Sequence, residues 1–150
     1  MIYPAIQSFG LTGEPLVSGI PAFTAAGDYA ERAVRFFENR FPSRDGGSRV
    51  NLTIVTDSSR ALRYIEKTHK ISNEIYELTV SPADGGAEIA VRISSGRGLF
   101  RALCTVSKLI EAGELCEGKI RDYPLFEKRG YIEGFYGKTW EHSSRLSVMS

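Results

Sequence analysis

The residues Arg129–Trp140 read RGYIEGFYGKTW and combine glycines, aromatic rings and one carboxylate, Glu133, in a short run. The segment Tyr131–Tyr136 is too apolar for a surface loop and too rich in glycine for a helix, which predicts a short buried strand. Gly134 and Gly137 would let the main chain come close to a ligand at the C-terminal end of that strand, because glycine has no side chain. Binding and catalytic groups lie at such strand ends in parallel β/α barrels, so this run predicts the start of a barrel.

This pattern resembles the opening of the catalytic barrel of glycoside hydrolase family 84. The resemblance is carried by Arg-Gly-x-Ile-Glu-Gly-Phe-Tyr-Gly-x-x-Trp, continued by Glu141-His142 and by Arg145-Leu146. The family comprises β-N-acetylglucosaminidases, among them the O-GlcNAc hydrolases and proteins once labelled hyaluronidases. The preceding residues Ile120–Phe126 are similar to the segment that joins an N-terminal α+β domain to the barrel, and the hexosaminidases of family 20 have a similar join.

The resemblance implies that the chain has two parts. Residues 1–123 would form a non-catalytic α+β domain like the N-terminal domain of hexosaminidases. Residues 124–150 would form a linker and the beginning of the catalytic (β/α)8 barrel. Only thirteen residues follow Gly137, so we expect a truncated TIM barrel, of which this chain holds the first strand.

For activity, the family implies hydrolysis of terminal N-acetylglucosamine glycosides with retention, by substrate-assisted catalysis. The 2-acetamido oxygen of the substrate attacks the anomeric carbon, while one of two adjacent aspartates polarises the acetamido group and the other acts as acid and base. These aspartates lie on a later strand of the family's barrel, so we expect no catalytic residue within this chain and the pair beyond Ser150. No metal or organic cofactor is implied. The implied partners are N-acetylglucosamine-containing glycosides and the missing barrel, which would pack against this domain; the 150-residue chain alone should be inactive.

The resemblance carries a sugar-binding role over to Gly134, Phe135 and Tyr136, since the matching glycine and its neighbours line the sugar pocket in family 84. A second interpretation stays open, in which the two aromatic rings are ordinary barrel packing. Glu133 could be a general acid, but ordinary glycosidases need two carboxyl groups about 5–9.5 Å apart. The resemblance favours a structural role for Glu133, as a buried carboxylate with hydrogen-bond partners.

Other polar residues invite a chemical interpretation and have a simpler structural one. His69, expected at the end of a polar helix, and His142 have no metal-ligating companions at suitable spacing. Asp57-Ser58-Ser59 lacks the histidine or glycine elbow of a serine nucleophile and predicts a helix cap. Ser94–Gly98 could hold an anion at a helix N-terminus, but the phosphate-binding consensus is absent, so a cap is expected there too.

Bulk composition excludes several classes of protein. The net charge is +1, from 19 basic and 18 acidic residues, so no overall field attracts nucleic acid or an anionic membrane. No basic segment followed by an apolar run opens the chain, and no run approaches the ~20 apolar residues of a membrane span. We therefore expect a cytoplasmic protein. Cys104 and Cys116 have no zinc-like spacing and predict two buried thiols rather than a disulfide.

Hydrophobic periodicity predicts the elements that would position these residues. One or two short strands are expected in residues 1–23, then a helix that begins near Thr24 or Asp28 and stops at Pro42. Val50, Leu52 and Ile54 alternate with polar residues and predict a half-buried strand, followed by a short helix capped by Asp57 or Ser58.

The second half has the clearest patterns. Alternation over residues 76–80 and 89–93, separated by Pro82–Gly86, predicts a β-hairpin with one polar face. Ser94 or Ser95 would cap an amphipathic helix that stops at Gly113, and a last strand is expected within 115–123. These elements predict an α+β fold, with helices on one face of a mixed or antiparallel sheet. The alternative to an enzyme fragment is a non-catalytic carbohydrate- or protein-binding module, with the polar sheet face and the strand 131–136 as its docking surfaces.

Overall fold

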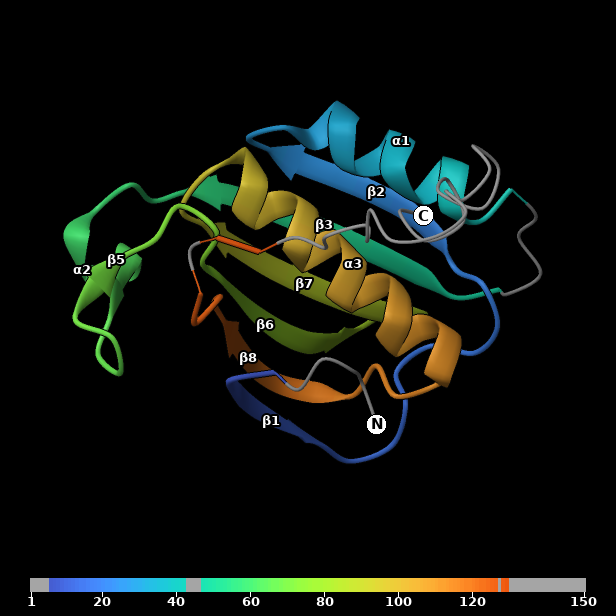
Figure 1. Ribbon diagram of the computed structural model, residues 1–150. Helices are drawn as coiled ribbons and strands as arrows, with labels where there is room; N and C mark the ends of the chain where they lie inside the picture. The colour runs from blue at the N-terminus through green and yellow to red at the C-terminus, as the bar shows by residue number, and fades with distance from the viewer. Residues whose placement is uncertain (1–5, 43–46, 127, 130–150) are drawn as a thin grey trace, which may run out of the picture.

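A six-stranded mixed sheet with two long helices forms the body of the protein (Figure 1). The computed structural model describes residues 6–42, 47–126 and 128–129. The sheet has the strand order β1-β8-β6-β7-β3-β2; β2–β3 and β3–β7 are parallel pairs and the other pairs are antiparallel. The elements are β1 (Ser8–Thr12), β2 (Ala22–Gly27), α1 (Ala30–Arg40), β3 (Arg49–Thr56), α2 (Arg60–Arg63), β4 (Tyr64–Ile65), β5 (Lys70–Ile71), β6 (Tyr76–Ala83), β7 (Gly86–Ile93), α3 (Gly96–Ala112) and β8 (Glu117–Asp122). The α+β class and the mixed sheet are confirmed.

Helices α1 and α3 lie side by side on one face of the sheet, α1 against β2 and α3 against β6 and β7 (Figure 1). Alternation explains this arrangement: in β3 and β7 every second side chain is buried and the residues between them are mostly exposed. The core lies between this face and the helices, where the rings of Phe23 and Phe37 stack with their centroids 4.1 Å apart. The other face of the sheet is polar, as the hairpin pattern predicts.

The beginning of α1 differs from the prediction. Thr24 lies in strand β2, and the helix follows Tyr29, which adopts a left-handed conformation with φ 58°. Asp28 does not cap the helix; its carboxylate accepts a hydrogen bond from the backbone N–H of Thr56 at 2.8 Å. The sequence AFTAAG of β2 has helix-forming alanines and little alternation, so only its pairing with β3 makes it a strand.

The connection between β3 and β6 also differs from the prediction. Ser59, rather than Asp57 or Ser58, caps the one-turn helix α2. His69 does not end a helix: it lies with φ 54° between β4 and β5, which pair as a small separate ribbon.

The hairpin and the second long helix follow the sequence closely. The β6–β7 turn consists of Asp84 and Gly85 alone, so the strands run further than the alternating residues indicate. Ser95 caps α3 by accepting a hydrogen bond from the N–H of Arg97, and Gly113 ends the helix with φ 65°. Strand β8 lies within the expected range.

Candidate functional site

The residues predicted to bind sugar, Gly134, Phe135 and Tyr136, lie outside the described part of the chain, as do Glu133 and His142. The sugar-binding assignment therefore stays a prediction. The described residues do contain a groove beside residues 123–126, and this groove is the candidate site.

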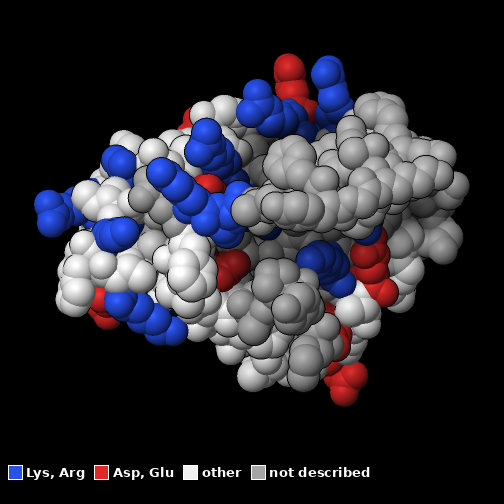
Figure 2. Space-filling model, in the orientation of Figure 1, with Lys and Arg blue, Asp and Glu red and all other residues white. Residues whose placement is uncertain are grey.

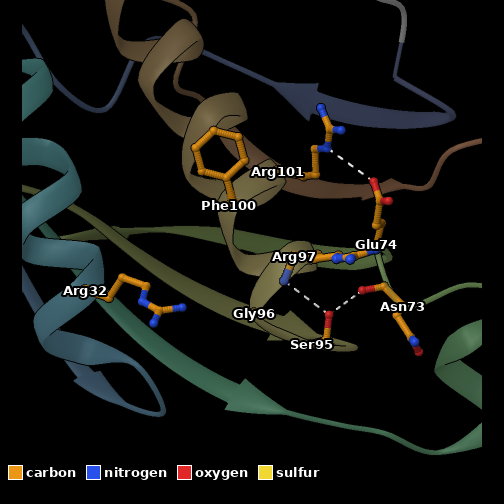
Figure 3. Close-up of a pocket in the computed structure, with 8 residues that line it drawn as sticks. All are labelled: Arg32, Asn73, Glu74, Ser95, Gly96, Arg97, Phe100 and Arg101. Carbon is orange, nitrogen blue, oxygen red and sulfur yellow. Dashed lines mark hydrogen bonds and ion pairs between the residues drawn. The ribbon is translucent and has the colours of Figure 1, made fainter. Parts of the chain in front are cut away.

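The groove consists of three hollows that share the side chain of Glu74. The first lies between α1 and the start of α3 and includes Arg32, Gly96 and Phe100 (Figure 3). The second lies under residues 123–126, against α3. The third lies between the β4–β5 ribbon and the same C-terminal residues. Arg97 belongs to the first and third hollows, which shows that they adjoin.

The first hollow is formed by two elements distant in sequence. Gly96 keeps the space open at the start of α3: a Cβ atom there would lie 3.5 Å from Nη1 of Arg32 and 3.9 Å from the ring of Tyr29. The guanidinium of Arg32 itself lies over the Tyr29 ring, 5.4 Å from its centroid. Phe100 forms the apolar side of the hollow; it is 55% exposed, and its ring meets Phe36 edge-on.

Arginines dominate the charge of the groove. The carboxylate of Glu74 forms ion pairs with Arg101, whose Nε lies 3.4 Å from Oε2, and with Arg129. Arg32 and Arg97 have no carboxylate partner among the described residues. Figure 2 shows Lys and Arg side chains gathered on this side of the molecule, where Figure 1 places α2 and the start of α3. The net charge of +1 thus conceals a locally basic surface.

A polar cluster of two buried side chains and one half-buried carboxylate lines the second hollow. Tyr76 and Asp122 are directly opposite each other in the β6–β8 pair, so their side chains share the face that meets α3. The Tyr76 hydroxyl lies 2.6 Å from Oγ1 of Thr105 and donates to Oδ2 of Asp122 at 3.3 Å. The backbone N–H of Gln7 donates to Oδ1 of Asp122 at 3.2 Å. Burial raises the pKa of Asp122 above its usual value, and burial also raises the pKa of Tyr76.

This cluster joins β6, α3, β8 and the segment before β1. Its carboxylate accepts hydrogen bonds from two donors, so the cluster ties the end of β8 to β6 and to the segment before β1. No pattern of spacing in the sequence reveals it.

The polar face of the sheet carries an ion-pair network. Glu77 pairs with Arg92 at 2.8 Å and with Arg121, its cross-strand neighbours on either side. Asp57 pairs with the same Arg92. Hydrogen bonds from Ser59, and then from Arg92, lower the pKa of Asp57 to about 2. Asp57 is therefore a turn residue and an ion-pair partner.

The remaining candidates have structural roles. Nδ1 of His69 lies 3.0 Å from the hydroxyl of Tyr64. Cys104 and Cys116 form no disulfide, as predicted, but both are half-buried rather than buried. Within the described ranges, no group of three histidine, cysteine or acidic side chains could hold a metal ion.

Comparison with known protein families adds no assignment, because no family model matches the chain. None of the described helices is long and apolar enough to span a membrane. Sequence reasoning missed the groove, because its residues come from α1, the β5–β6 connection, α3 and the end of the chain. Of its residues, those within Ser94–Gly98 and Ile120–Phe126, and also Arg129, belong to patterns that the sequence shows, and the predicted cap is confirmed at Ser95.

Proposed function

We propose that this chain is the N-terminal, non-catalytic part of a retaining β-N-acetylglucosaminidase of the glycoside hydrolase family 84 type. The observation that carries the proposal is the motif Arg129–Trp140, which follows directly after the α+β domain. The six-stranded mixed sheet with helices on one face is compatible with the front domain that the resemblance implies, and supports the proposal only at the level of fold class.

Five of the described carboxylates already have ion-pair or backbone hydrogen-bond partners. Glu74 and Glu77 each pair with two arginines, and Asp57 pairs with Arg92. Asp28 and Asp122 accept backbone hydrogen bonds. A glycosidase needs one carboxyl group that is ready to donate a proton and another that is free to act on the substrate or on water. On this proposal both groups come from later strands of the barrel.

In the complete enzyme, Gly134, Phe135 and Tyr136 would line one side of the sugar pocket, with main-chain groups close to the sugar at Gly134. The acetamido group of the substrate would supply the nucleophile, so no metal or organic cofactor is required. The barrel would pack against this domain at the end from which the linker leaves.

Hydrolysis of an aryl N-acetylglucosaminide tests the proposal. The purified 150-residue chain should release no aryl alcohol, and a protein extended by the coding sequence beyond codon 150 should release it. The extension should add roughly 250 residues, the usual length of a barrel, with an Asp-Asp pair at a strand end. A stop codon at position 151, or an inactive extended protein that nonetheless folds, would rule the enzyme out.

The alternative is a non-catalytic module that binds carbohydrate or protein. The groove favours this alternative over a purely structural role, because Phe100 is exposed there and Arg32 and Arg97 have no carboxylate partner among the described residues. Calorimetric titration of the 150-residue chain with N-acetylglucosamine oligomers separates the two, since tight binding by the isolated chain is expected only for the module.

A further inference from the structure

Large exposed hydrophobic side chains concentrate around the groove where the chain leaves the domain. Seven such side chains are exposed in the described residues, and five of them border the groove: Tyr29, Ile71, Phe100, Leu125 and Phe126. Phe126 is the most exposed, at 73%. We call these five residues, with the arginines between them, the exit surface. An apolar patch rimmed by polar residues is typical of a surface that another part of a protein covers.

The composition of the exit surface favours a protein segment as its occupant. Aromatic residues and arginine are enriched in protein interfaces. Here Arg32, Arg97 and Arg101 lie beside Phe100, and their guanidinium groups can stack on aromatic rings as well as donate hydrogen bonds.

The opposite face of the sheet is a poor candidate for the same role. Glu77, Arg92 and Arg121 satisfy one another there, and covering them would remove charged groups from water without providing new partners. Val55 is its one large exposed hydrophobic side chain among the described residues. Docking of a segment on the exit surface is therefore more favourable in free energy than docking on the opposite face of the sheet.

The course of the chain identifies the occupant. Residues 123–126 form part of the groove, and Arg129 pairs with Glu74 in its centre, so the chain leaves the domain within the exit surface. The segment that follows contains Tyr131, Phe135, Tyr136 and Trp140. It thus combines a short tether with Tyr131 and Trp140, whose rings are not assigned to the sugar pocket. These rings match the apolar side chains and also Arg32 and Arg97, which have no carboxylate partner among the described residues.

We propose that the exit surface is the docking site for the segment of this chain that follows Arg129, residues 130–150. In the proposed glycosidase this contact would seat the first barrel strand against the domain, so the inference extends that function. Its test, however, measures docking alone.

Trp140 is the only tryptophan and reports on this contact in the 150-residue chain. The experiment measures its emission maximum and its quenching by acrylamide in the unaltered chain, in Phe100→Asp, and in the control Val55→Asp. Phe100 and Val55 are matched, being 55% and 54% exposed on opposite sides of the sheet. Circular dichroism would check that each variant is folded.

We expect partial protection of Trp140 in the unaltered chain. Phe100→Asp should shift the emission to the red and raise the quenching constant toward that of free tryptophan, whereas Val55→Asp should leave both unchanged. Arg97→Gln should weaken the protection in the same direction. Full quenching in the unaltered chain, or equal effects of the two aspartate variants, would overturn the proposal.

Protection that increases with protein concentration would also overturn it, by showing that the segment docks on a second copy. The glycosidase assay is independent of this result. Docking without hydrolysis by the extended protein would refute the enzyme alone, and hydrolysis without docking would refute the exit surface alone.

Discussion

Loss of the hydrogen bond between Tyr76 and Thr105 should lower the free energy of unfolding, because this bond joins the sheet to α3 in a buried position. Tyr76 is 1% exposed and Thr105 is 7% exposed, so bulk water has little access to either hydroxyl. Tyr76→Phe removes the donor to Asp122 and leaves the Thr105 hydroxyl without its hydrogen-bond partner. Leaving a buried polar group unsatisfied costs about 1–3 kcal/mol. Because the Thr105 hydroxyl can turn to a carbonyl of its own helix, we expect about 1–2 kcal/mol of destabilisation.

Thr105→Val should cost less, about 0.5–1.5 kcal/mol, since the Tyr76 hydroxyl keeps Asp122 as its acceptor at 3.3 Å. The double variant removes both hydroxyls and should lose less stability than the sum of the single variants, by about 1 kcal/mol. Urea unfolding of all four proteins, followed by circular dichroism, gives these free energies. If the loss of stability in the double variant equals the sum of the two single losses to within about 0.5 kcal/mol, the two hydroxyls are not coupled and the prediction is wrong.

Three further predictions concern the charge and packing of the domain. Because the pKa of Asp122 is raised in the folded state, its contribution to stability is present below its usual pKa of 3.8 and is lost as pH rises through the raised value. Asp122→Asn should therefore reduce the fall in unfolding free energy over that pH interval, and an unchanged slope would contradict the assignment. A Cβ atom on Gly86 would lie 1.9 Å from a backbone oxygen of β3, so Gly86→Ala should cost about 1–3 kcal/mol; Gly47→Ala, where nothing lies within 4 Å, is the matched control in the same thermal unfolding experiment. Burial raises the pKa of the Cys104 thiol, so its alkylation should be slower in the folded chain than after unfolding in urea, and equal rates would contradict this.

Local sequence patterns predict an element correctly where its conformation depends on residues close to it in the chain. The β6–β7 hairpin has alternating residues and a turn containing Asp84 and Gly85, so its pairing is determined within a few residues. Helix α3 has an apolar face, the cap Ser95 and the stop Gly113. These features predict the α+β class without reference to the rest of the chain.

Local patterns failed where a distant neighbour decides the conformation. Capping residues predict a helix that begins near Thr24 or Asp28, whereas β2 continues through Thr24 to Gly27. Pairing with β3 supplies hydrogen-bond partners along its length, and the N–H of Thr56 draws Asp28 away from the helix end. His69 was placed at the end of a helix for a similar reason, since the β4–β5 pairing cannot be recognised from two residues on each side.

The sequence by itself determined the hairpin, the two long helices, the polar sheet face and the motif Arg129–Trp140, because spacing along the chain encodes each of them. Tertiary structure alone decided the strand order, the Tyr76–Thr105–Asp122 cluster and the exit surface. Arg32 and Gly96 are 64 positions apart, yet packing of α1 beside α3 brings the Arg32 guanidinium next to Gly96. No periodicity within either helix contains that information, since the contact depends on how both helices bury their apolar faces against one sheet.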